Sequence, residues 1–208
     1  MFKEVFRFEW HYRKGRAANY IYFGIIFLLC FLAVASPVVR IGGAAGQIKA
    51  NAPYVLSMMT LIMSFALTMI TSAVMGVAVL RDFDHNTEAI LFSTPLKKFD
   101  YLMGRFAGSF LVVVLIYCGI WLGFMFGFGV GKVLPWDVEW KDKEILAFNA
   151  WHYFQPFLVF TLTNLFISGT IFFVAGALAR NSIMIYTQGI LLIIAYELAN
   201  TFVSDMEY

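Results

Sequence analysis

Charged side chains are scarce in this sequence, and their scarcity excludes most classes of protein. Only 13% of the 208 residues are Asp, Glu, Lys or Arg, whereas soluble domains average about 25%. The formal net charge is only +2, and no run of basic residues alternates with aromatic ones. A nucleic-acid-binding protein needs such a basic surface to neutralise phosphates. A soluble domain and a nucleic-acid partner are therefore not expected.

Patterns of catalytic and metal-binding residues are also missing. There are three histidines and no H-E-x-x-H pair, so no metal site is expected. The phosphate-binding G-x-x-x-x-G-K-[ST] loop and the G-x-S-x-G elbow are absent as well. The two cysteines, Cys30 and Cys118, lie in apolar stretches and indicate buried thiols. We expect no cofactor and no enzymatic activity in this chain, so that any use of ATP requires another subunit.

Long apolar stretches are abundant instead, and hydrophobic residues make up 61% of the chain. The five longest cover approximately residues 19–35, 55–80, 106–130, 154–179 and 183–203. Each is near or above the roughly 20 residues that a helix needs to cross a bilayer. Within lipid, a single apolar stretch of this length can satisfy its backbone hydrogen bonds only as a helix. The sequence therefore predicts an all-α integral membrane protein, a single domain over 1–208 with five transmembrane helices.

The segment 1–16 is polar and precedes the first apolar stretch. Basic side chains recur at helical spacing at Lys3, Arg7, His11 and Lys14, and apolar ones at Met1, Val5, Phe8 and Tyr12. This pattern predicts an amphipathic helix at the membrane interface. Glu9 and Arg13 lie four residues apart on the apolar side and are expected to pair against a neighbouring helix. A solvated basic leader that orients insertion is the alternative.

The distribution of basic residues predicts the orientation of the chain. Ten of the fifteen Lys and Arg residues lie before the first stretch, in 81–105 or at Arg180, and the other five lie in the alternate segments. The positive-inside rule then places the N-terminus, 81–105 and Arg180 in the cytoplasm.

Small residues recur every fourth position in two of the stretches. They are Ser64, Thr68, Ser72 and Gly76 in the second, preceded by Thr60, and Gly119, Gly123 and Gly127 in the third. Such spacing predicts close helix packing, and a lining for a polar path is an alternative for the second stretch. Polar residues also lie inside later stretches, at Asn164, Glu197 and Asn200. A carboxylate at such a depth must be paired, protonated or facing water. Glu197 is expected either to reach the outer interface or a neighbouring helix, or to line the outer part of a path.

The polar segment 81–105 has the signals of a short surface helix. Asp84 can accept backbone N–H bonds at a helix start, Glu88 suits the first turn, and Pro95 stops the helix. Leu91 and Phe92 would then be presented at the membrane surface, and exposed apolar residues rimmed by charge mark a partner site.

This segment resembles the cytoplasmic loop of type-2 ABC exporter permeases. The matching features are the acidic stretch 82–84, Thr87 and Glu88, the turn that contains Leu91, Ser93-Thr94-Pro95, Lys97-Lys98 and Tyr101-x-x-Gly104-Arg105. The resemblance implies a transmembrane half of an ATP-binding-cassette exporter, located in a bacterial inner membrane, that pairs with a second half or a second copy. It also implies that a separate ATPase subunit docks on a coupling loop at Asp84, Thr87, Glu88, Leu91, Phe92 and Pro95.

Further stretches are similar to a narrower group, the Bacteroidota permeases fused to a zinc aminopeptidase domain. They are residues 51–54, 75–82, 151–157 and 186–189. That family has six spans in each half, so the five spans expected here indicate an N-terminal fragment. The alternative function is a membrane anchor or scaffold for an attached extracytoplasmic enzyme such as a peptidase.

Overall fold

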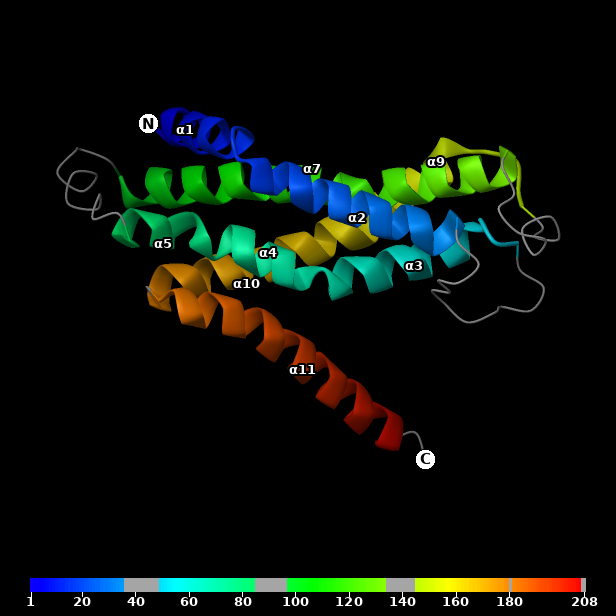
Figure 1. Ribbon diagram of the computed structural model, residues 1–208. Coiled ribbons are helices and arrows are strands. Elements are labelled where there is room, and N and C mark those ends of the chain that lie inside the picture. The colour runs from blue at the N-terminus through cyan, green and yellow to red at the C-terminus, as the bar shows by residue number, and fades with distance from the viewer. Residues whose placement is uncertain (36–48, 85–96, 134–144, 180, 207–208) are drawn as a thin grey trace. The chain divides into compact units, whose positions relative to one another are not determined.

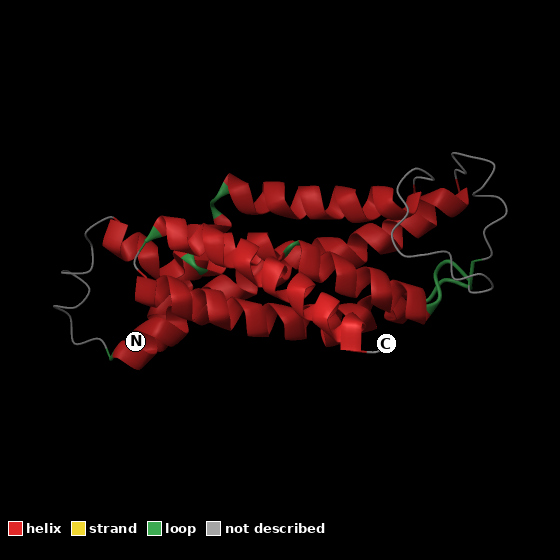
Figure 2. Cartoon of the chain, turned by 90° about the horizontal axis from the view of Figure 1, so that it is seen from below, coloured by secondary structure: helices red, strands yellow, loops and turns green. Residues whose placement is uncertain are grey.

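The computed structural model describes residues 1–35, 49–84, 97–133, 145–179 and 181–206 (Figure 1). Within these ranges every regular element is a helix and there is no strand, as Figure 2 shows. The prediction of an all-α protein is confirmed. The helices are α1 (Phe2–Lys14), α2 (Ala17–Ala35), α3 (Pro53–Ala66), α4 (Thr68–Met75), α5 (Val77–Asp84), α7 (Lys98–Val133), α9 (Ala150–Pro156), the π-helix η1 (Phe157–Thr161), α10 (Leu162–Ala179) and α11 (Ser182–Met206).

Three of the described helical stretches are long and apolar enough to cross a membrane, namely Ala17–Ala35, Lys98–Gly131 and Ala150–Ala179. A fourth is added if α3 and α4–α5 form one interrupted span. In α11 the apolar part of the described chain is the shorter stretch Thr187–Ala199. Membrane-length helices are thus present, and the number five remains a prediction.

Two of the predicted spans are interrupted. In the second, helix breaks fall at Leu67 and Gly76. The Ser64 hydroxyl donates a hydrogen bond to the carbonyl of Leu61 at 2.9 Å, a type of bond that bends helices, and glycine is a poor helix former. In the fourth, Pro156 is followed directly by η1. Proline has no N–H to donate and crowds the preceding turn, so the helix changes its hydrogen-bond register there.

The described chain forms two compact units, and each has its own core. The first contains Met1–Arg13, Ala66–Val113 and Phe166–Tyr208. In it α11 packs along α4, and the Gln188 amide donates a hydrogen bond to the Ser72 hydroxyl at 3.3 Å. A Cβ built on Gly176 would overlap the backbone of Gly76, so two helices touch there through glycine alone. Edge-to-face aromatic contacts join Phe106 to Phe173, with ring centroids 5.3 Å apart.

The second unit contains Lys14–Phe65 and Val114–Leu165. Its buried residues include Tyr117 and Phe124 of α7. The side chain of Asn51 is bonded to the backbone of Leu146 in both directions, at 3.1 Å as donor and 2.6 Å as acceptor. The Asn164 amide donates to the carbonyl of Ser64 at 3.1 Å. This bond satisfies a carbonyl near the end of α3, which lipid could not satisfy.

Candidate functional site

A buried carboxylate on α1 organises the most polar part of the first unit. Glu9 is fully buried, and its two oxygens accept hydrogen bonds from Arg13, Arg81 and Arg105 and from the Ser109 hydroxyl at 3.3 Å. The distance from Arg81 Nη2 to Glu9 Oε2 is 2.8 Å. The predicted Glu9–Arg13 pair is therefore confirmed, and it is part of a larger group. We call Glu9, Arg13, Arg81, Asp82, Tyr101 and Arg105 the charged cluster.

Asp82 is the second carboxylate of the charged cluster. Nη2 of Arg105 donates to both of its oxygens at 2.7 Å, and the Tyr101 hydroxyl donates to it as well. Arg105 is only 3% exposed, and its guanidinium donates to both buried carboxylates, Glu9 and Asp82. Hydrogen bonds between ionised groups are about twice as strong as neutral ones. The bonds of the charged cluster therefore favour a single arrangement of α1, α5 and α7.

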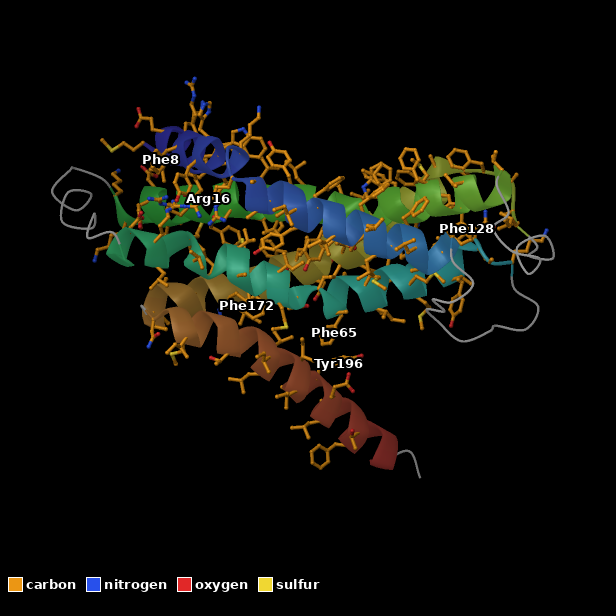
Figure 3. The ribbon with its side chains drawn as sticks, viewed as in Figure 1. Phe8, Arg16, Phe65, Phe128, Phe172 and Tyr196 are labelled. Carbon is orange, nitrogen blue, oxygen red and sulfur yellow. The ribbon has the colours of Figure 1, made fainter. Side chains whose placement is uncertain are left out.

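Aromatic rings cover the guanidinium groups on the α1 side. Arg81 Cζ lies 3.9 Å from the centroid of the Tyr12 ring, and Arg105 Cζ lies 5.2 Å from that of Phe8. Phe8 is labelled on α1 in Figure 3. These are cation–π distances. The rings keep water from the arginines while they attract the positive charge.

The charged cluster has three guanidinium groups and two carboxylates, which leaves one positive charge in excess. Burial by itself raises the pKa of Glu9, but Arg13, Arg81 and Arg105 outweigh burial and lower that pKa to about 2. Glu9 is thus ionised at neutral pH. Because removing one partner leaves the others buried without compensation, such a cluster is sensitive to single substitutions.

Two glycines of α7 make room for this arrangement. A Cβ on Gly104 would lie 2.7 Å from Val5 Cβ, and one on Gly108 would lie 2.8 Å from Glu9 Cβ. Real side chains do not approach so closely, so only glycine lets α1 rest on α7 at this distance. The Tyr101-x-x-Gly104-Arg105 pattern therefore has a structural basis: Tyr101 and Arg105 hold Asp82, and Gly104 admits α1.

The charged cluster lies at both ends of the segment that the sequence marks as a partner site. Arg81 and Asp82 are in the last turn of α5, and Tyr101 and Arg105 are in the first turns of α7. The nitrogen Nη2 of Arg13 also donates to the carbonyl of Val74 in α4 at 3.0 Å. The arrangement holds the end of α5 and the start of α7 to each other, to α1 and to α4, on either side of residues 85–96.

Most of the predicted ATPase-contact residues lie outside the described residues, namely Thr87, Glu88, Leu91, Phe92 and Pro95. Asp84 is the last residue of α5. The contact of these six residues with an ATPase subunit remains a prediction.

The other predicted site residues are found in both units. Thr68 and Ser72 are buried in α4, Gly76 faces Gly176, and Ser64 is buried in α3. Gly119, Gly123 and Gly127 lie against α2, with distances of 3.1, 2.7 and 2.9 Å from a built Cβ to the backbone oxygens of Phe23, Phe27 and Phe31. Glu197 and Asn200 both lie on α11, and the Glu197 side chain is exposed. The backbone carbonyl of Glu197 accepts a hydrogen bond from the Thr201 hydroxyl at 2.9 Å. Within the described ranges no three His, Cys, Asp or Glu side chains gather as metal ligands would.

Comparison with known proteins places the chain in a family. A scan against protein-family models matches residues 41–204 to the family described as ABC-2 family transporter protein. A search of curated proteins finds no match, and neither does a search of solved structures. The matched region covers most of the chain and includes Arg81, Asp82, Tyr101 and Arg105. The chain therefore belongs to the ABC-2 transporter family and is a multi-pass membrane component, a permease, of an ABC transporter.

Proposed function

We propose that the chain is one permease half of an ABC exporter and that the charged cluster couples it to a separate ATPase subunit. A second half, either another protein or a second copy, would complete the transmembrane path. The observation that supports this proposal is the position of the charged cluster. It joins α5 and α7, which flank residues 85–96, through Glu9 and Asp82, and the sequence of that segment resembles an ATPase-docking loop.

The charged cluster provides a route for mechanical coupling. When the ATPase closes on ATP, it would displace the docked segment together with the flanking ends of α5 and α7. The displacement would pass through Arg81 and Arg105 to α1 and, through the bond from Arg13 to Val74, to α4. Such shifts of packed helices are a common form of switching transition. On α11, Glu197 and Asn200 would line the outer part of the path or contact a further span.

The proposed orientation of the chain in the membrane can be tested by cysteine labelling. We expect His85→Cys to react with a membrane-impermeant maleimide only after the membrane is opened. Trp140→Cys should react in intact cells or spheroplasts, because the segment 131–153, between the third and fourth apolar stretches, is proposed to lie outside. Both variants would be made in a background in which Cys30 and Cys118 are replaced by serine. The reverse pattern would overturn both the orientation and the docking proposal.

The docking contact can be tested by copurification with the ATPase. Glu88→Lys reverses a charge and Leu91→Asp removes an apolar contact, so each should abolish association while membrane insertion is unchanged. Pro95→Ala should have a weaker effect, because it only allows the helix to continue. Glu144→Lys is the matched control: it makes the same charge change in the loop proposed to lie outside. If Glu88→Lys and Leu91→Asp retain the ATPase at unchanged stoichiometry, the segment is not the contact.

A further inference from the structure

The exposed face of α1 carries basic residues that the charged cluster does not use. Glu9 and Arg13 are buried on one side of the helix, and this fixes how α1 is rotated within its unit. Lys3, Arg7 and His11 project from the opposite side and are all exposed, and Lys14 continues the same line at the end of the helix. Burial on one side thus determines which residues of α1 face outward.

No carboxylate of the described residues pairs with Lys3, Arg7 or Lys14. Glu4, an acidic residue on this side of the helix, interacts with the N-terminal amine at 3.6 Å. A line of cations without counter-ions attracts anions from outside the chain.

Exposed apolar residues flank this basic face. Met1 is 53% exposed and Phe8 is 57% exposed, and Phe8 is stacked on Tyr12. Helices with a basic face and aromatic or aliphatic residues beside it lie in the headgroup region of a bilayer. Such flanks fit the boundary between headgroups and acyl chains, and the short link to the membrane-spanning α2 favours lipid over an acidic protein as the partner.

The chain connection keeps the end of α1 close to the membrane. Only Gly15 and Arg16 separate α1 from α2, which is apolar enough to span the bilayer. Three Cα steps from Lys14 to Ala17 reach at most about 11 Å. The headgroup layer on each side of a bilayer is roughly 5–8 Å thick. Lys14 therefore stays at or next to the level of the lipid phosphates.

We propose that the face of α1 formed by Lys3, Arg7, His11 and Lys14 binds the headgroups of anionic phospholipids. The line from Lys3 to Lys14 is about 16 Å long at 1.5 Å per residue, which is too long for one phosphate ion. Because the other side of α1 carries Glu9, this surface anchors the charged cluster to the lipid. The inference does not depend on the proposed ATPase contact.

Trp10 provides a local reporter for the test. Its helical position is beside Lys3 and Lys14, and it is partly exposed. The four other tryptophans would be replaced by phenylalanine, and the protein would be reconstituted without ATPase in vesicles of phosphatidylcholine and phosphatidylglycerol. Quenching of Trp10 fluorescence by brominated phosphatidylglycerol, compared with brominated phosphatidylcholine, measures the preference for the anionic lipid at α1.

We expect a clear preference for phosphatidylglycerol in the parent protein. The combined variant Lys3→Gln, Arg7→Gln and Lys14→Gln should lose it, by about fivefold for each charge at low salt, which corresponds to about 1 kcal/mol per basic residue. Glu4→Gln should keep or increase the preference. Lys49→Gln with Lys141→Gln and Lys143→Gln is the matched control, because it lowers the net charge equally outside α1 and should leave the preference unchanged.

Three results would overturn the inference: equal quenching by the two lipids in the parent, an unchanged preference in the combined variant, or loss of the preference in millimolar inorganic phosphate. The last result would indicate a site for a single ion. If the combined variant fails to fold, Arg7→Gln alone decides with the same readout. The thermal unfolding midpoint in detergent should be the same for variants and parent, because none of these residues belongs to the charged cluster.

Discussion

Both parts of α7 pack closely on another helix through glycines four residues apart, but the side chains beside the two contacts differ in charge. In the first unit, Gly104 and Gly108 admit α1, and the approach brings together ionised side chains around Glu9. In the second unit, Gly119, Gly123 and Gly127 admit the backbone of α2, and the surrounding side chains are apolar. Glycines four residues apart allow close packing in both units, but among the described residues charges cluster only at the contact in the first.

This difference separates what a small-residue pattern can indicate from what it cannot. The pattern indicates where another helix packs, because a missing Cβ lets two backbones approach. It does not indicate which side chains meet beside the contact. In the first unit those side chains are charged and buried, so their substitution should cost more than added bulk at the apolar contact of the second unit.

The largest effect is expected for Glu9→Gln, which keeps the size of the side chain and removes its charge. Three guanidinium groups would then share one buried carboxylate, and breaking buried pairs of this kind costs about 3–5 kcal/mol. We expect a large fall in the thermal unfolding midpoint in detergent. Glu4→Gln on the exposed side of the same helix is the control and should change little. Equal midpoints for Glu9→Gln and the parent would show that the charged cluster contributes no stability.

The sequence predicts the helices but only part of the charged cluster. The apolar runs predict the membrane-length helices because lipid allows no other backbone structure. The Glu9–Arg13 pair follows from helical spacing. Arg81 and Arg105, however, lie 72 and 96 residues from Glu9, and nothing in local spacing connects them. The one available signal is that charged residues stand at the ends of apolar runs, where a buried partner is needed.

The second largest effect is a loss of stability in acid that depends on Glu9. Its pKa falls from an ordinary 4.5 to about 2 in the folded protein. A lowered pKa contributes stability above the unfolded value, and this stability is lost as pH falls from about 4.5 to about 2. The full loss is roughly 3 kcal/mol, at about 1.4 kcal/mol per pKa unit. The difference in unfolding midpoint between the parent and Glu9→Gln, measured from pH 7 to pH 2, should shrink as pH falls. A constant difference throughout would contradict the assigned pKa.

At the apolar contact, Gly123→Ala should have a moderate effect. The added Cβ would lie 2.7 Å from the backbone oxygen of Phe27 and 2.8 Å from Cys30 Cβ, and a backbone cannot move aside cheaply. Overpacking of this kind costs about 1–3 kcal/mol. Gly24→Ala and Gly129→Ala are matched controls in the same two helices, with nothing within 4 Å of the new Cβ. They should be neutral or slightly stabilising, since alanine favours helix. If all three variants behaved alike, close approach would not explain the glycine spacing.

The smallest effect is expected for Asn164→Ala, which tests a hydrogen bond in the second unit that the glycine pattern does not involve. The variant removes the donor to the Ser64 carbonyl, near the end of α3. Hydrogen bonds between membrane helices contribute on average only about 0.6 kcal/mol, because other groups can substitute for the lost partner. Combining Asn164→Ala with Gly123→Ala sharpens the comparison. The two sites involve different helix pairs, so their effects on the unfolding midpoint should add. A combined loss well above the sum would mean that the α2–α7 contact and the α3–α10 hydrogen bond stabilise the second unit jointly, as the residues of the charged cluster are expected to do in the first.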